Sequence, residues 1–172
     1  DSRYAKLLGI YGNCSQIDEF KLSTLKKLDS CFSQLNGKSV LISSEHLFHL
    51  NISAIKDVQS FLQRYFDKLQ VVCYLREPIS FSVSAWSTNV RGGSKTQYRF
   101  APELFNADQS KPYNNWKSVF GDNLTARYFD RSSMIGSNIL DDFFYSANLK
   151  LDCNEYIKPS NENQSLSYEC LV

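Results

Sequence analysis

The chain has 172 residues, of which 42% are hydrophobic, and a formal net charge of +1. That length and apolar content suit a single domain over residues 1–172 with one hydrophobic core, and the small net charge excludes a strong basic field for nucleic-acid binding. No apolar stretch approaches the roughly 20 residues that a membrane helix needs, and the first residues lack the form of a signal peptide, so we expect no membrane span.

The first half of the chain alternates between helical and strand-like patterns. Apolar residues recur at helical steps over 17–35, before Asn36-Gly37 ends the run, and again over 51–67. Short apolar runs at 39–43 and 70–75 predict two strands. Strand, helix and strand in this order form a βαβ unit, so we expect the two strands to be parallel neighbours in a sheet covered on both faces.

The second strand runs into a turn and then into a third helix. Pro78 suits the first position of that helix, where its missing N–H and fixed φ cost nothing. Arg76 ends the strand, and Ser84 lies on a polar stripe of the helix. The two side chains could grip an anion such as phosphate, because carboxyl ends of parallel strands are where α/β proteins bind ligands. Alternatively, Arg76 pairs with an acid such as Glu77 and Ser84 has no binding role.

The second half of the chain contains a polar tract and then three further elements. Residues 94–113 have little period and read as a long loop or lid. Residues 114–120 look helical and stop at Gly121, and 123–129 alternate like a strand. Ser137 can cap a last helix that reaches about Leu149.

Several of these segments resemble one enzyme family. A strand, Arg76, seven residues, Ser84 and a Gly-bearing turn are similar to the segment with which sulfotransferases that use 3′-phosphoadenosine 5′-phosphosulfate (PAPS) hold the 3′-phosphate. The resemblance, strongest to bacterial members associated with surface polysaccharides, runs from about Ser39 to Ser167. Its later motifs are Trp116, Phe120-Gly121-Asp122-Asn123-Leu124, Phe129-Asp130-Arg131, Asp142-Phe143 and Asn163-Gln164-Ser165-Leu166-Ser167.

The resemblance implies a fold, a reaction and a cofactor site. The fold would be an α/β domain, a parallel sheet flanked by helices of the P-loop NTPase-like sulfotransferase type. The reaction would transfer a sulfuryl group from PAPS to a hydroxyl of a carbohydrate or polysaccharide, leaving 3′-phosphoadenosine 5′-phosphate (PAP). Arg76 and Ser84 would hold the 3′-phosphate and Phe129 would lie near the adenine, although Phe129 is equally well explained as a core residue.

The same resemblance implies a catalytic base after residues 39–43. In the family a strand at this place ends in the catalytic His or a Glu, and here Glu45 falls at that position with His46 next to it. Without the resemblance, Glu45 caps a helix or forms a salt bridge and His46 lies at the rim of a cleft. His46 and His49 are the only histidines, and no Cys or third ligand is grouped with them, so we expect no metal site.

One family element is missing from the sequence. No Lys-Ser/Thr-Gly-Thr loop, which would hold the 5′-phosphosulfate, precedes the first predicted strand. We therefore expect an N-terminally incomplete fold, no sulfotransferase activity from residues 1–172 alone, and self-association through unpaired sheet. The alternative function is a noncatalytic binding or scaffold protein of the same fold that has lost this donor loop. The alternative fold is a kinase or glycosyltransferase fragment, but no clear set of acidic metal-binding residues follows the strands.

The cysteines and glycosylation triplets bear on location. Five scattered cysteines without a CxxC pair indicate reduced thiols, and hence a cytoplasmic protein. Four Asn-x-Ser/Thr triplets, at Asn13, Asn51, Asn123 and Asn163, keep a Golgi-lumenal or secretory location as the alternative.

Overall fold

The computed structural model describes residues 14–35, 37–92 and 108–149, and contacts divide the chain into two units, Asp1–Ser43 and Ser44–Val172. The described part of the first unit contains one long helix, α2 (Cys14–Ser33). The helix predicted over 17–35 is thus confirmed, although it ends before the predicted stop, where Gly37 takes a φ of +81°. Apolar side chains of α2 are exposed, namely Phe20, Leu22, Leu25 and Leu28.

The strand predicted over 39–43 is wrong. These residues belong to neither a helix nor a strand, and Val40, Leu41 and Ile42 are exposed by 38%, 63% and 49%. An apolar run has the composition of a strand, but it becomes one only where a neighbouring chain supplies hydrogen-bond partners. Self-association through such exposed apolar residues stays a prediction.

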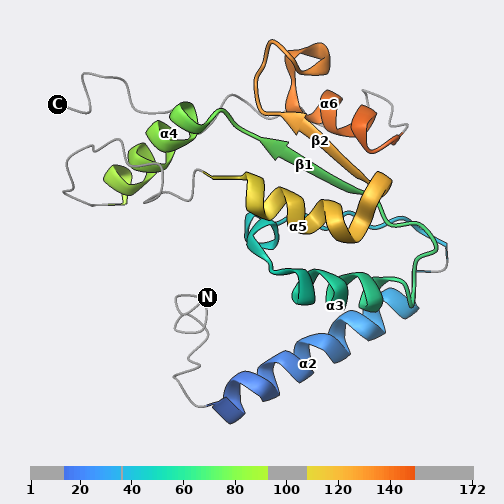
Figure 1. The fold of residues 1–172 in the computed structure, drawn as a ribbon. Helices are drawn as coiled ribbons and strands as arrows, with labels where there is room; N and C mark the ends of the chain where they lie inside the picture. Colours follow the sequence, from blue (N-terminus) through green and yellow to red (C-terminus); the bar gives the residue numbers. More distant parts are fainter. Residues whose placement is uncertain (1–13, 36, 93–107, 150–172) are drawn as a thin grey trace. The chain divides into compact units, whose positions relative to one another are not determined.

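A parallel pair of strands forms the centre of the second unit (Figure 1). The strands are β1 (Val71–Leu75) and β2 (Leu124–Tyr128), in register from Val71 opposite Leu124 to Leu75 opposite Tyr128. The strands predicted at 70–75 and 123–129 are therefore confirmed, as is a parallel sheet within a mixed α/β architecture. The predicted pairing is corrected: β1 pairs with β2, and the 39–43 segment has no part in the sheet that the structure describes.

The remaining elements of the second unit are helical. They are η1 (Glu45–His49), α3 (Ile52–Leu62), α4 (Pro78–Arg91), α5 (Ser110–Phe120), η3 (Gly121–Asn123), η4 (Ile135–Ser137) and α6 (Ile139–Ser146). Local chemistry sets several of their starts. Asn51 caps α3 by accepting from the Ala54 N–H at 2.9 Å, and Pro78 opens α4 as the sequence predicts.

Three helix boundaries differ from those predicted. Helix α3 ends at Leu62 and is followed by turns, so it is shorter than 51–67. Helix α5 begins at Ser110 within the polar tract, because Pro112 falls in the first turn, where its missing N–H breaks no intrahelical bond. The cap of α6 is Asn138, whose side chain accepts from the Leu140 N–H at 2.8 Å, and not Ser137.

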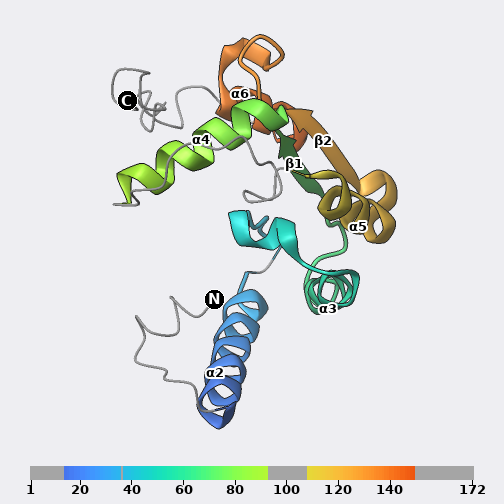
Figure 2. The same ribbon diagram turned by 60° about the vertical axis from the view of Figure 1, so that its left-hand side comes forward.

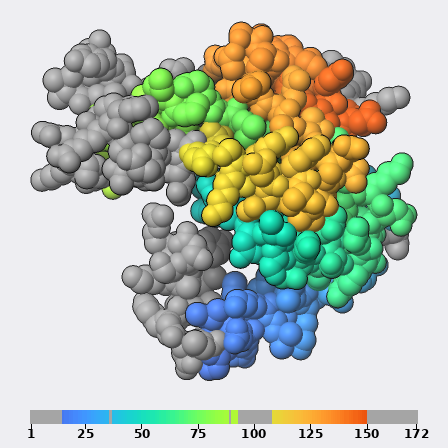
Figure 3. Space-filling model, viewed as in Figure 1, coloured from blue at the N-terminus to red at the C-terminus, as the bar shows by residue number. Residues whose placement is uncertain are grey.

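Helices cover both faces of the two-stranded sheet (Figures 1 and 2). On one face Leu124 packs with Ile55, Trp116 and Phe120 in the hydrophobic core, which brings in α3 and α5. The side chains of α3 and α5 form one continuous surface in Figure 3. On the other face Tyr74 contacts helix α6. Alternate residues of β1 therefore face different layers, as the period of a strand requires.

None of the helices in the described ranges combines the length and the apolar character needed to cross a membrane.

Candidate functional site

A cleft of about 510 Å³ lies where the two parallel strands end. It is bounded by the last residues of β1 and β2, by the first turn of α4 and by the loop after β2. Phe129 and Tyr128 are its aromatic side chains, and its other polar side chains are Arg76, Glu77, Ser80, Asp130 and Ser133. This is the edge of a parallel sheet at which α/β proteins bind ligands.

Arg76 and Phe129 meet in this cleft. The guanidinium carbon of Arg76 lies 5.6 Å from the centre of the Phe129 ring, within the range of a cation–π contact. Phe129 is itself held in place, because its N–H donates to the Leu75 carbonyl at 2.7 Å and its ring packs edge to face with that of Tyr74. The centres of the two rings are 6.3 Å apart. The structure thus brings together two of the three residues that the sequence assigned to the cofactor.

Glu77 occupies the N-terminus of α4. Its Oε1 accepts from the Ile79 N–H at 2.8 Å and its Oε2 from the Ser80 N–H at 2.7 Å. These two hydrogen bonds, with a smaller contribution from the charge of Arg76, lower the pKa of the Glu77 carboxyl. The N–H groups at the start of α4 that would attract an anion are therefore already paired, and the Ser80 and Ser133 hydroxyls donate to carbonyls, so the cation available to an anion in the cleft is Arg76.

Gln109 contacts the main chain of Arg76, a contact that the sequence did not reveal. Its Nε2 donates to the Arg76 carbonyl at 2.7 Å, and its Oε1 accepts from the Arg76 N–H at 3.0 Å. The residue lies in the polar tract, in which a glutamine gives no local pattern. The sequence predicts the next helix only at 114–120, so no signal pointed to Gln109 before the structure showed that α5 begins at Ser110.

The other predicted site residues lie elsewhere. Ser84 is on α4, one turn beyond Ser80, and is not among the side chains that line the cleft. Glu45 and His46 open η1, with side chains that are 89% and 73% exposed, and the Glu45 Oε1 lies 3.8 Å from the His46 Nε2. Neither lines the cleft. The physical reason is the missing strand, since Glu45 would reach the sheet edge only if residues 39–43 lay beside β1.

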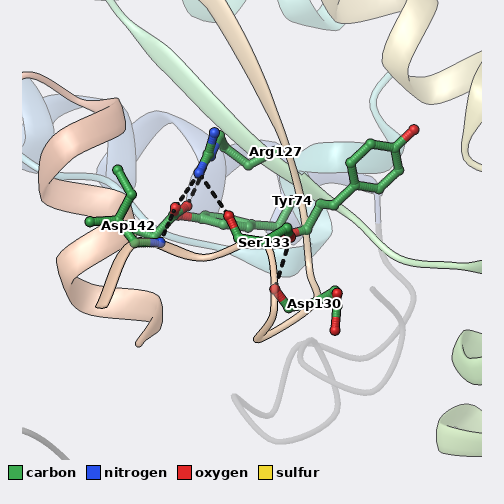
Figure 4. A network of polar contacts seen from close by, with 7 residues as sticks. Tyr74, Arg127, Asp130, Ser133 and Asp142 are labelled. Carbon is green, nitrogen blue, oxygen red and sulfur yellow. Dashed lines mark hydrogen bonds and ion pairs between the residues drawn. The ribbon is translucent and has the colours of Figure 1, made fainter. Parts of the chain in front are cut away.

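A buried ion pair lies on the α6 side of the sheet (Figure 4). Asp142 is fully buried, and its carboxylate accepts from the Arg127 Nε at 3.1 Å and also from the Arg127 Nη2. It also accepts from the Tyr74 hydroxyl at 2.8 Å and from the Ile135 N–H at 3.0 Å. Tyr74 and Arg127 are opposite each other in the strand register, so one carboxylate joins β1, β2 and α6.

The charges of this network satisfy one another. The hydrogen bond from Arg127 is the largest cause that lowers the pKa of Asp142 to about 2, while burial and the bond to Asp142 raise the pKa of Tyr74. A second hollow, of about 500 Å³, borders Arg127 and the end of α6. Because the guanidinium of Arg127 is already paired, this hollow lacks a cation to hold an anion, and we assign the network a structural role.

Within the described ranges, no three His, Cys, Asp or Glu side chains lie close enough to hold a metal ion. Comparisons with models of known families, with curated proteins and with solved structures found no match to this chain. The functional interpretation consequently depends on the residues of the cleft.

Proposed function

We propose that the cleft binds the 3′-phosphoadenosine part of PAPS, and that the chain is a part of a sulfotransferase that modifies a carbohydrate hydroxyl. The observation that carries the proposal is the position of the Arg76 guanidinium, over the Phe129 ring and at the carboxyl end of two parallel strands. A fixed cation next to an aromatic face fits a ligand in which a phosphate and a planar base are joined by a sugar.

The charges of the cleft restrict where phosphate can bind. Arg76 is the one cation among the side chains that line it, against the carboxylates of Glu77 and Asp130. A single phosphate can use the Arg76 fork, whereas a second phosphate in the same place would meet carboxylates. The Ser80 hydroxyl donates to the Glu77 carbonyl at 3.0 Å in the free protein, so it would have to turn to donate to the phosphate. We therefore assign the 3′-phosphate to Arg76, the adenosine to the Phe129 side, and the 5′-phosphosulfate to no residue of this cleft.

In the proposed reaction, the acceptor hydroxyl oxygen forms a bond to sulfur as the bond from sulfur to the 5′-phosphate oxygen breaks, leaving PAP. A base must take the hydroxyl proton, and Glu45 and His46 remain the proposed candidates. Both side chains lie outside the cleft as described, so this step needs η1 to approach the sheet edge.

The second candidate function is binding without catalysis. It is favoured by the exposed positions of Glu45 and His46, which line no part of the cleft. A noncatalytic protein of this kind would bind PAP through Arg76 and Phe129 but would transfer no sulfate. Incubation with PAPS and a mixture of polysaccharides, followed by detection of PAP, tests the noncatalytic function: repeated PAP release would exclude it, whereas residues 1–172 alone are expected to release no PAP under either function.

Calorimetric titration with PAP tests the site itself. We expect Arg76→Ala to weaken PAP binding at least about tenfold, because one charge-assisted interaction is worth roughly 1.5–3 kcal/mol. Arg64→Ala is the matched control: Arg64 also lies over aromatic rings, 4.8 Å from Phe61 and 5.1 Å from Tyr65, but does not line the cleft. Its PAP affinity should match that of the wild type.

Titration with adenosine 5′-phosphate checks which phosphate is recognised. This nucleotide lacks the 3′-phosphate, so it should bind the wild type about as weakly as PAP binds Arg76→Ala. Equal affinity of the wild type and Arg76→Ala for PAP would show that Arg76 does not hold the 3′-phosphate, and this result would contradict the proposed function.

A further inference from the structure

The main chain of Arg76 has an unusual partner at the end of β1. The strand pairing ends where the Phe129 N–H donates to the Leu75 carbonyl. Because successive residues of a strand direct their N–H and C=O groups to alternate sides, the groups of Arg76 point away from β2. The side-chain amide of Gln109 pairs with both of them, at 3.0 Å and 2.7 Å. One side chain thereby takes the place of a neighbouring strand.

Gln109 is in turn held by α5. Its carbonyl accepts from the Tyr113 N–H at 3.0 Å in the first turn, and the same helix places Trp116 and Phe120 in the hydrophobic core. A movement of Arg76 relative to the core would therefore break both bonds to Gln109. The next residue, Glu77, is fixed by its own hydrogen bonds at the start of α4.

We propose that Gln109 is the positioning residue of the cleft: its amide fixes the peptide of Arg76, and so fixes where the guanidinium meets the ligand. The proposal rests on the proposed function for the ligand, but the clamp is a property of the free protein. Gln109 lines no part of the cleft itself, so any effect on PAP passes through Arg76. A long side chain on a mobile peptide would lose the fixed geometry that phosphate recognition needs.

The first readout is amide hydrogen exchange in the absence of ligand. The Arg76 N–H donates to Gln109, whereas the Phe129 N–H donates within the strand pair and serves as the internal reference. In Gln109→Ala we expect exchange at Arg76 to accelerate at least about tenfold relative to Phe129. An unchanged ratio overturns the proposal whether or not PAP binds, which separates this failure from failure of the proposed function.

The second readout is the affinity for PAP, which we expect Gln109→Ala to lower about tenfold. Gln59→Ala is the matched control, because the Gln59 Nε2 also donates to a distant carbonyl, that of Val119 at 3.3 Å, but away from the cleft. It should bind PAP as the wild type does. If Gln109→Ala binds PAP within twofold of the wild type, the clamp does not position Arg76 for the ligand.

Gln109→Glu tests the positioning role through the pH dependence of PAP affinity, which a purely structural role of Gln109 would not produce. An ionised carboxylate can accept from the Arg76 N–H but cannot donate to the Arg76 carbonyl, whereas a protonated carboxyl can do both, as the amide does. The ratio of wild-type to variant affinity for PAP should therefore be large near pH 7 and fall as the pH drops below about 5. Ionisation of the ligand affects both proteins and cancels in this ratio. A ratio that does not change with pH contradicts the positioning role.

Discussion

Replacement of Asp142 by Asn tests the buried ion pair that joins β1, β2 and α6. The amide can keep one oxygen towards the Ile135 N–H and the Arg127 Nη2, but its NH₂ group then faces the Arg127 Nε–H, which is also a donor. Removal of one partner from a buried pair costs about 3–5 kcal/mol. The Arg127 side chain is 29% exposed, so water can partly solvate it. We therefore expect a loss near the lower end, about 3 kcal/mol.

Urea unfolding followed by circular dichroism measures this loss, and its pH dependence identifies the cause. The pKa of Asp142 is about 2 in the folded chain and 3.8 is its ordinary value. The carboxylate therefore stabilises the fold fully above the unfolded-state pKa, and this contribution is lost as the pH falls towards the folded-state pKa. The difference in unfolding free energy between the wild type and Asp142→Asn should accordingly shrink between about pH 5 and pH 3.

Asp141→Asn is the matched control for this experiment. Both carboxylates lie in the first turn of α6, where the helix dipole favours negative charge by about 0.3–1 kcal/mol. The bonds from Arg127, Tyr74 and Ile135 go to Asp142, so the control keeps them and should cost less than Asp142→Asn. A loss in Asp142→Asn no larger than that of the control, or a difference from the wild type that stays constant from pH 5 to pH 3, would refute the role assigned to the ion pair.

Two further substitutions test the core and the cleft. Trp116→Phe should lower the free energy of unfolding by about 2 kcal/mol. The indole N–H of Trp116 donates to the Leu47 and Phe48 carbonyls, both at 3.2 Å, and a phenyl ring has no N–H to donate. A change below about 0.5 kcal/mol in urea unfolding would contradict this. Ser80→Ala should weaken PAP binding while Ser84→Ala leaves it within about twofold, since Ser80 lines the cleft and Ser84 does not. The reverse result in calorimetry would favour the phosphate position predicted from the sequence.

The elements that the sequence predicts well are those with local causes. Pro78 marks the first turn of α4 through its own ring geometry, and β1 and β2 are indicated within a few residues by an apolar run and by alternation, respectively. Strand pairing has no such local cause. Chain proximity favours 39–43 as the neighbour of β1, whereas the structure pairs β1 with β2, about fifty residues further along.

The buried ion pair was missed for a related reason. Arg127 stands in an alternating strand, where it could face solvent, and Asp142 stands between Asp141 and Phe143 at the start of a helix. Neither pattern shows that the charge is buried or identifies its partner, because both depend on which helix covers which face of the sheet. Tyr74 likewise reads as a strand residue, and its hydroxyl bond to Asp142 follows only from the packing of α6.

The cleft follows the same logic. Arg76 and Phe129 each come directly after a strand, and parallel strands in register must end at the same edge, so the pairing of β1 with β2 is sufficient to bring the two side chains together. Glu45 could join them only through a strand at 39–43, and that strand is not formed in the described chain. A base from η1 would therefore have to be carried to the cleft by a different arrangement of η1 and the sheet. The binding proposal does not depend on that movement, whereas the catalytic proposal does.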